Sequence, residues 1–179
     1  MGLAYAERQP VIAAGDYDLR PVRPSDAGLM TLFTSDLRVA QATSSIPHPL
    51  PPGTTEAFIE RCMAESRIED AWAIDGTRAD CGELMGVISL TRLDIGQAEI
   101  GYWVAPVFWN SGVASAAVSA LVAANPLGCR TIFATVQQDN PASARVLTNS
   151  GFAYLGDAEC YCLARGYTVP TWTYSRKLD

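Results

Sequence analysis

A seven-residue segment, Trp109 to Ser115, has the composition of an anion-binding loop. It joins a predicted strand to a predicted helix, and a helix N-terminus carries unpaired N–H groups and a partial positive charge. Gly112 lets those amides approach a ligand without a Cβ in the way, and Ser111 and Ser115 add hydroxyl groups. The arrangement suits a phosphate or a pyrophosphate. Helix capping alone explains the same residues, and the segment is neither a P-loop nor a dinucleotide-binding fingerprint.

A second polar segment begins another helix beside the predicted sheet. Asn140 followed by Pro141 is typical of a helix N-terminus, with proline at the first helical position, and Ser143 stands three residues after the cap. Capping fully explains Asn140, and a polar residue at the place of Ser143 is ordinary. The functional interpretation is that both side chains face a cleft beside the first loop.

Both segments belong to a predicted alternation of strands and helices. About seven strands are predicted, at 17–23, 71–74, 84–93, 97–104, 131–136, 152–162 and 168–176. About four helices are predicted from apolar stripes and caps, at 26–33, 54–67, 113–124 and 141–149. The order β-α-α-β-β-β-α-β-α-β-β has no linker or repeat. It predicts one α/β (α+β) domain over residues 16–179, behind an N-terminal arm of residues 1–15.

The composition limits the classes of function. The chain has 179 residues, a net charge of −6 and 49% hydrophobic residues, which indicates a globular protein that matches neither nucleic acid nor an anionic membrane. No apolar run reaches the roughly 20 residues of a membrane span, and the start lacks a secretory signal. Five scattered cysteines and one histidine, His48, supply no metal-site spacing. We therefore expect a cytoplasmic protein with reduced cysteines and no metal.

Taken together, the two polar segments resemble the GNAT superfamily. Within it they are similar to the branch of the ribosomal-protein N-terminal (RimJ/RimL-like) acetyltransferases. The matching residues are Ala98-Glu-Ile-Gly-Tyr-Trp-Val-Ala-Pro-Val-Phe-Trp109 with Gly112-Val-Ala114, and Asn140-Pro-Ala-Ser-Ala-Arg-Val-Leu147 with Gly151-Phe152. Upstream they are Leu19-Arg-Pro-Val-Arg23, Ile46-Pro-His-Pro49 and Ala57-Phe-Ile59, so the resemblance covers residues 17–177.

The resemblance implies a mixed, mostly antiparallel, twisted sheet that splays into a V between its fourth and fifth strands, at 97–104 and 131–136. In the family the strand ending at Val104 carries a bulge. Acetyl-CoA would be the cosubstrate, with its pantetheine arm along the open strand edge and its pyrophosphate on the loop amides. The implied cofactor-binding residues are Trp103, Val104, Ala105, Trp109, Asn110, Ser111, Gly112, Val113, Ala114, Ser115, Asn140 and Ser143.

The same resemblance implies direct transfer of an acetyl group to a primary amine, on a small molecule or a protein N-terminus, in a ternary complex. Glu99 would be the base that takes the amine proton through water, although a strand glutamate that faces solvent explains it equally well. Leu147 stands where many members carry the tyrosine that protonates the thiolate, so that role is vacant or passes to Ser143. Asn110 and Ser111 also depart from the family's phosphate loop, which would weaken coenzyme A binding.

These departures leave a second interpretation open, a catalytically silent acyl-CoA-binding or regulatory domain with the same fold. A third is nucleotide binding without acyl chemistry. The altered loop and the missing tyrosine favour the silent domain, whereas Glu99 and Ser143 favour the enzyme. The sequence leaves open the identity of the acceptor and the oligomeric state, a homodimer included.

Overall fold

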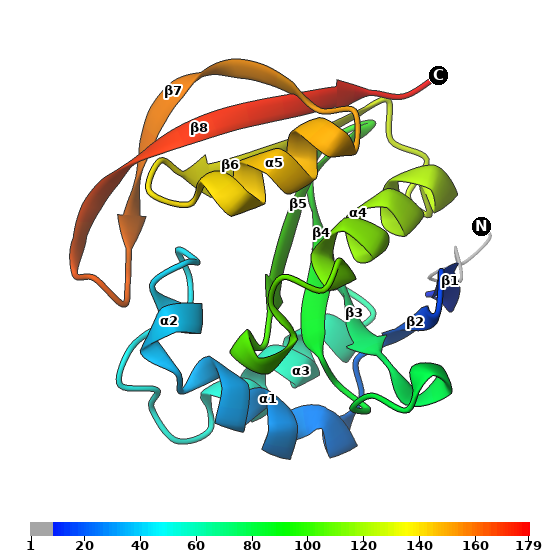
Figure 1. The fold of residues 1–179 in the computed structure, drawn as a ribbon, viewed down its shortest axis with the longest axis vertical. Coiled ribbons are helices and arrows are strands. Elements are labelled where there is room, and N and C mark those ends of the chain that lie inside the picture. Colours follow the sequence, from blue (N-terminus) through cyan, green and yellow to red (C-terminus); the bar gives the residue numbers. More distant parts are fainter. Residues whose placement is uncertain (1–8) are drawn as a thin grey trace.

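Eight strands form one mixed sheet in the computed structural model, which describes residues 9–179 (Figure 1). Their order across the sheet is β1-β2-β3-β4-β5-β6-β8-β7. Their bounds are β1 Ile12–Ala14, β2 Tyr17–Pro21, β3 Glu69–Asp75, β4 Gly86–Asp94, β5 Gln97–Val104, β6 Thr131–Gln137, β7 Ala153–Cys162 and β8 Tyr167–Lys177. All neighbours are antiparallel except β5 and β6, which are parallel. The predicted sheet is therefore confirmed, with one strand more than expected.

The additional strand, β1, lies in the expected N-terminal arm of residues 1–15. Gly15, at φ 62°, and Asp16 form the two-residue turn between β1 and β2. Gly-Asp is a hairpin signal, and it makes part of the arm an edge strand rather than a loose segment. The indole of Trp72 also donates a hydrogen bond of 2.8 Å to the carbonyl of Pro10. Residues 1–8 of the arm lie outside the described range.

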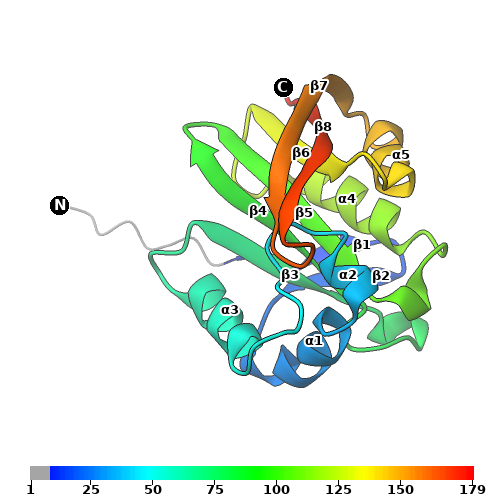
Figure 2. The same cartoon turned by 90° about the vertical axis from the view of Figure 1, so that its left-hand side faces the viewer.

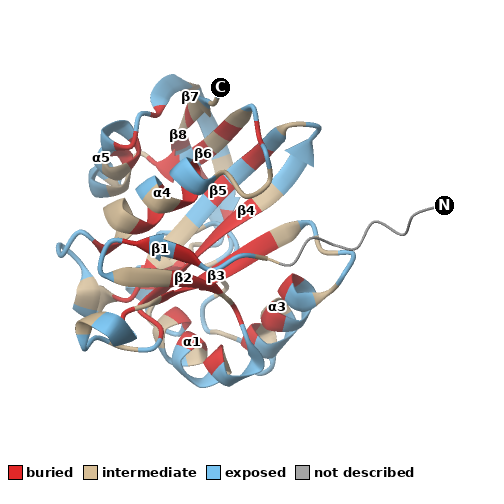
Figure 3. Ribbon diagram, turned by 90° about the vertical axis from the view of Figure 1, so that its right-hand side faces the viewer, coloured by how far each residue is buried: buried red, intermediate tan, exposed pale blue. Residues whose placement is uncertain are grey.

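Five α-helices cover the two faces of this sheet. Their bounds are α1 Ala27–Thr34, α2 Leu37–Ala40, α3 Thr54–Met63, α4 Val113–Ala124 and α5 Pro141–Asn149. Apolar residues of α4 and α5 pack on one face and form the larger core, whereas α1 and α3 pack on the other face and form a smaller one (Figure 2). Burial is concentrated on the strands between these layers (Figure 3). Within residues 9–179, no helix has the length and apolar character to cross a membrane.

Two helices differ from the prediction for local reasons. The short helix α2 was not expected; it begins because the carboxylate of Asp36 accepts a hydrogen bond of 2.9 Å from the amide of Arg38, an ordinary N-cap. Helix α3 ends at Met63 rather than near Arg67. It stops there because Ala64 takes an extended backbone with ψ 146°.

A buried ion-pair network holds the α1 layer against the sheet. Arg20 on β2 donates to both carboxylate oxygens of Asp26, at 2.9 and 2.8 Å, just before α1 begins. It also donates to Asp75 at the end of β3, at 2.8 Å. Arg20 and Asp26 are both buried, and bidentate pairs of this kind have defined geometry. The network thus ties the start of α1 to β2 and β3.

Candidate active site between strands β5 and β6

The sheet opens between β5 and β6. These parallel strands are paired only from Gln97 with Thr131 to Glu99 with Phe133. Beyond Glu99, β5 remains paired to β4 and β6 remains paired to β8, so the two strands diverge. The open edge of β5 therefore runs from Ile100 to Val104. This is the V that the family resemblance implied, at the expected pair of strands.

The bulge implied on β5 is not found where it was expected. The pairing of β4 with β5 is regular from Gly86–Val104 to Arg92–Ala98, and its register shift falls between Arg92 and Asp94, next to the turn. Divergence from β6, rather than an irregularity in β5, opens the V.

The regular ladder also corrects which backbone groups face the opening. The amide of Ala105 donates to the carbonyl of Met85 at 2.8 Å, so Ala105 and Trp103 direct their backbone groups toward β4. Tyr102 and Val104 then face the open edge. Trp103 and Ala105 are therefore the wrong residues for backbone pairing with a pantetheine arm, although the Trp103 residue does line the opening.

Trp109 has a structural role that the sequence did not reveal. Its indole N–H donates to the carbonyl of Val104 at 2.7 Å, which occupies one acceptor on the open edge. The guanidinium of Arg38 lies over the same indole, 5.7 Å from the ring centroid, within the range of a cation–π contact. Trp109 thus fixes the path of the loop between β5 and α4.

A first cavity, of about 590 Å³, lies at this loop and at the start of α5. Asn110 has φ 59° and Gly112 has φ 81°, left-handed conformations that asparagine and glycine tolerate best. They turn the chain so that the first amides of α4 lie at the cavity. Ten of the twelve predicted cofactor-binding residues line it: Trp103, Val104, Trp109, Asn110, Gly112, Val113, Ala114, Ser115, Asn140 and Ser143.

The two remaining residues, Ala105 and Ser111, do not line the cavity. Ala105 is fully buried against β4. The hydroxyl of Ser111 donates to the carbonyl of Phe108 within the turn, so it supports the loop rather than a ligand. Asn140 lines the cavity, and its side chain also accepts a hydrogen bond from the Ser143 amide at 3.3 Å. Asn140 therefore caps the N-terminus of α5 in this structure.

The first cavity is lined by more cationic than anionic groups. Arg38, Arg145 and Arg165 come from α2, α5 and the turn between β7 and β8, and Asp139 is the acidic residue beside them. Arg165 pairs with Asp139 at 2.7 Å. Sequence reasoning missed this charge because the arginines lie in three distant segments; only Arg145 was inside a matching motif.

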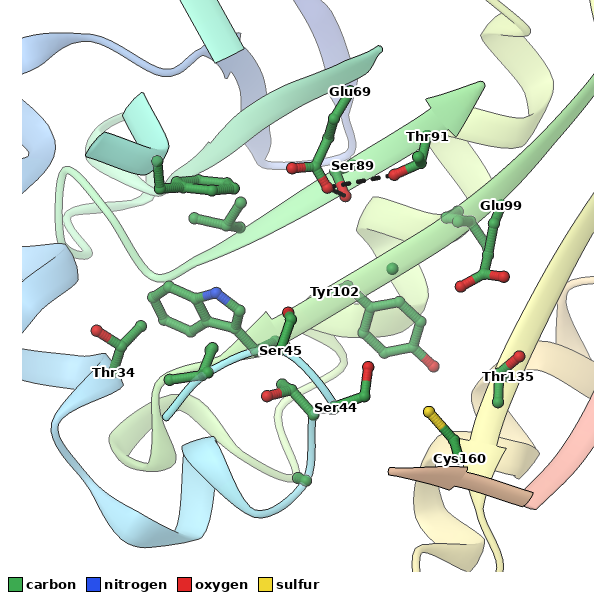
Figure 4. A pocket seen from close by; sticks show the side chains of 18 of the residues that line it. Thr34, Ser44, Ser45, Glu69, Ser89, Thr91, Glu99, Tyr102, Thr135 and Cys160 are labelled. Atoms are coloured by element: carbon green, nitrogen blue, oxygen red, sulfur yellow. Dashed lines mark hydrogen bonds between the residues drawn. The ribbon is translucent and has the colours of Figure 1, made fainter. Parts of the chain in front are cut away.

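A second cavity, of about 650 Å³, lies on the opposite face of the sheet, below α1, α3 and the connection at 42–50 (Figure 4). Its floor is polar, because hydroxyl, carboxylate and carboxamide side chains replace apolar residues on this face of five strands. They include Glu69, Ser89, Thr91, Glu99, Thr135, Gln137, Thr171 and Thr173. The sequence had predicted only Glu99 among them.

Glu99 has the properties of an accessible but partly desolvated carboxylate. Its side chain is exposed to the cavity, while the surrounding protein withdraws water from it and raises its pKa above the ordinary value. A raised pKa brings a carboxylate closer to the range in which it can accept a proton from an amine. His48, by contrast, is exposed and lies outside both cavities.

Tyr102 stands where the two cavities meet, and it lines both. Its phenolic oxygen lies 2.7 Å from the hydroxyl of Ser143 and 3.2 Å from the carbonyl of the same residue. Burial raises the pKa of Tyr102 to about 12, so the phenol keeps its proton near neutral pH. In the sequence, Tyr102 had no role beyond its place among the residues that carry the family resemblance.

Leu147 is completely buried and belongs to the larger core. It lines neither cavity. The position at which many family members carry the proton-donating tyrosine therefore does not face the opening, whereas Ser143 does.

Comparisons with known proteins agree with this geometry. Residues 17–153 match the family described as the Acetyltransferase (GNAT) domain. The chain belongs to this family. YoaA of Bacillus subtilis (strain 168), described as an uncharacterized N-acetyltransferase, is 37% identical over 108 residues, which are 58% of this chain and 60% of YoaA. The match therefore spans less than two thirds of that relative.

Solved structures share the fold over nearly the whole chain. The ribosomal L7/L12 alpha-N-protein acetyltransferase RimL, in complex with coenzyme A, has a TM-score of 0.82 at 20% identity, covering 95% of this chain and 99% of RimL. Spermidine N-acetyltransferase from Vibrio cholerae, in complex with coenzyme A and spermine, has a TM-score of 0.76 at 14% identity, covering 90% of this chain and 95% of that one. The predicted GNAT fold is thereby confirmed.

Proposed function

We propose that this GNAT domain is an acetyl-CoA-dependent N-acetyltransferase that acts on a primary amine. The observation that carries the proposal is that two cavities of opposite charge meet at one opening in the sheet, beside Tyr102. The charged residues that line the first cavity are three arginines and one aspartate, and those that line the second are three glutamates and one arginine. A reaction that joins an anionic acyl carrier to a cationic amine needs two such compartments with a shared wall.

The first cavity fits acetyl-CoA. Amides at the start of α4 and the side chain of Arg145 supply donors for phosphate oxygens. The open edge of β5 offers the backbone groups of Tyr102 for an extended, amide-bearing pantetheine arm. The comparisons add support, since RimL was solved with coenzyme A bound.

The second cavity fits the acceptor amine. Glu99 would take a proton from the ammonium group through water, which leaves a neutral nitrogen to attack the thioester carbonyl. The C–N bond would form, the C–S bond would break, and the amide of Val104 would stabilise the oxyanion. The departing thiolate would receive the proton of Ser143, whose oxygen is hydrogen-bonded to Tyr102. The second proton of the reacting nitrogen, lost as the amide forms, would return to Ser143 through water.

The test is a panel of amines with acetyl-CoA in which free thiol release is measured, together with calorimetry of coenzyme A binding. The enzyme should release thiol with at least one amine, and Glu99→Gln should slow that turnover without weakening coenzyme A binding. Binding of coenzyme A with no turnover on any amine would instead establish the silent domain. Melting protection by ATP but not by coenzyme A would establish a nucleotide-binding domain.

We also place the protein in the cytoplasm. All five cysteines are free thiols, and burial raises the pKa of Cys62 to about 12. Free thiols that stay protonated are typical of a reducing compartment.

A further inference from the structure

The second cavity, which we propose binds the acceptor amine, carries an excess of negative charge. Glu69, Glu99 and Glu159 line it, and Arg61 is the cationic side chain in the same lining. The guanidinium of Arg61 lies 5.9 Å from the ring centroid of Phe58. None of the ion pairs found among residues 9–179 joins Arg61 to a cavity glutamate. A cation that enters this cavity therefore meets carboxylates that are not already neutralised.

Two of these glutamates stand in one row across the sheet. Glu69 on β3 is directly opposite Thr91 on β4, and Thr91 is directly opposite Glu99 on β5. Both carboxylates leave the same face of the sheet and line the same cavity (Figure 4). Two strand spacings separate their Cα atoms, a distance of about 10 Å.

Neutral donors hold Glu69 in its orientation. Its carboxylate accepts hydrogen bonds from Ser89 Oγ at 3.1 Å and Thr91 Oγ1 at 3.3 Å (Figure 4). It also accepts one from Cys62 Sγ at 3.6 Å. These contacts fix the side chain but leave its charge in place. A carboxylate held at a cavity wall in this way binds a cation more strongly than a neutral group, because charge-assisted hydrogen bonds are the stronger kind.

An independent observation also points to a polar ligand in this cavity. Thr171 on β8 lines it and is only 1% exposed. Its hydroxyl oxygen has no hydrogen-bond partner within the described part of the chain. Buried hydroxyl groups normally have a partner, so one polar group in the wall of this cavity is left unpaired.

We propose that the acceptor is a primary amine with a second positive charge, such as an α,ω-diamine. One nitrogen reacts beside Glu99 while the second ammonium pairs with Glu69. A chain of roughly four to six methylene groups suits a row that measures about 10 Å between Cα atoms. This inference rests on the proposed acetyltransferase function, because it assigns the substrate class of the same site.

The experiment compares putrescine and cadaverine with butylamine and pentylamine as acceptors, by kcat/KM for thiol release. The diamine should exceed the monoamine of equal length by about tenfold, which corresponds to about 1.4 kcal/mol and exceeds the statistical advantage of two equivalent amines. Glu69→Gln should remove most of that preference by raising KM for the diamine, and its effect on the monoamines should be much smaller. The glutamine keeps an oxygen for Ser89 and Thr91, so the fold is retained.

Glu56→Gln is the matched control. Glu56 is exposed on α3 and lies outside the cavity, so the same change in net charge there should not alter the preference. Three outcomes would overturn the inference while acetyl transfer stands. They are equal rates for diamines and monoamines, an equal loss of kcat/KM for both in Glu69→Gln, and acetylation of peptide N-termini but not of diamines. Failure to release thiol with every amine would instead overturn the proposed function.

Discussion

The phenolic oxygen of Tyr102 and the hydroxyl oxygen of Ser143 lie 2.7 Å apart, and their hydrogen bond crosses from β5 to α5 at the opening of the V. The carbonyl of Ser143 also lies 3.2 Å from the phenol. A phenol has one proton, so Tyr102 donates to only one of these oxygens at a time. When it donates to the hydroxyl, the proton of Ser143 is directed away from Tyr102 and is available to a thiolate.

Removal of the phenolic hydroxyl should therefore slow the chemistry. We expect Tyr102→Phe to lower kcat about 3- to 10-fold, the equivalent of one hydrogen bond, with KM for acetyl-CoA unchanged. The check is a double-mutant cycle with Ser143→Ala, measured by steady-state kinetics. The double variant should be no slower than Ser143→Ala alone. Independent, additive losses would show that Tyr102 acts by packing and not through Ser143.

A tyrosine at the usual family position should not restore a proton donor. Leu147 is fully buried, so Leu147→Tyr should overpack the core and destabilise the fold by about 1–3 kcal/mol, without any rise in kcat. Denaturant unfolding and kinetics measure the two effects. Leu147→Met is the control of similar volume and should lose less than about 1.5 kcal/mol. A faster enzyme with unchanged stability would contradict this account.

The pH dependence of activity should reflect the ionisation of Glu99. Burial raises its pKa above the ordinary value of 4.5, and a base must be deprotonated, so activity should be lost as the pH falls through this raised pKa. The ratio of kcat/KM between the wild type and Glu99→Gln, with the same amine, cancels the titration of the amine itself. This ratio should rise with pH through a value above 4.5 and then level off. A ratio that does not change with pH would exclude Glu99 as the base.

Arg145 should contribute to acetyl-CoA affinity. It lines the first cavity and forms no ion pair with the other residues of the described range. Arg145→Ala should raise KM for acetyl-CoA about 3- to 10-fold, and the difference from wild type should shrink at high salt. Arg130→Ala, at an exposed position outside both cavities, removes the same charge and should have little effect. Equal effects of the two variants would indicate only a general electrostatic field.

The backbone conformation of Asn110 gives a test of the altered phosphate loop. At φ 59°, Asn110→Ala should destabilise the fold by about 1 kcal/mol, whereas Asn110→Gly should be tolerated. Thermal melts and calorimetry with coenzyme A measure stability and affinity. If asparagine weakens the loop, Asn110→Gly should bind coenzyme A more tightly than the wild type. Unchanged affinity would show that the asparagine loop is as competent as a glycine loop.

Local signals explain what the sequence predicted well. The small-residue stripe of α4, the Asn-Pro cap of α5 and the glycine at 112 depend on neighbouring residues, and each appears as expected. Together with the family resemblance they indicated the V and most of the first cavity. The N-terminal hairpin was missed, although its Gly-Asp turn was a readable signal.

The groups that the sequence missed are those brought in by long-range pairing. Glu69 faces Glu99 only because β3, β4 and β5 align in register, and Arg38 reaches Trp109 from a four-residue helix. Tyr102 was missed for another reason. Tyr102 alternates with Trp103 along β5, so the sequence did not say which of the two faces the cleft, and only the divergence from β6 brings the Tyr102 hydroxyl to the opening.

The two cavities also determine how a turnover would end. Because the two cavities lie on opposite faces of the sheet and meet beside Tyr102, the acetylated amine would leave from the second cavity and coenzyme A from the first. Acetylation replaces an ammonium with an uncharged amide, so the product is attracted less strongly than the amine to a compartment lined by glutamates. The reaction itself would thus favour release of the acetylated product from the second cavity. Because each substrate has its own cavity, the amine and acetyl-CoA need not bind in a fixed order.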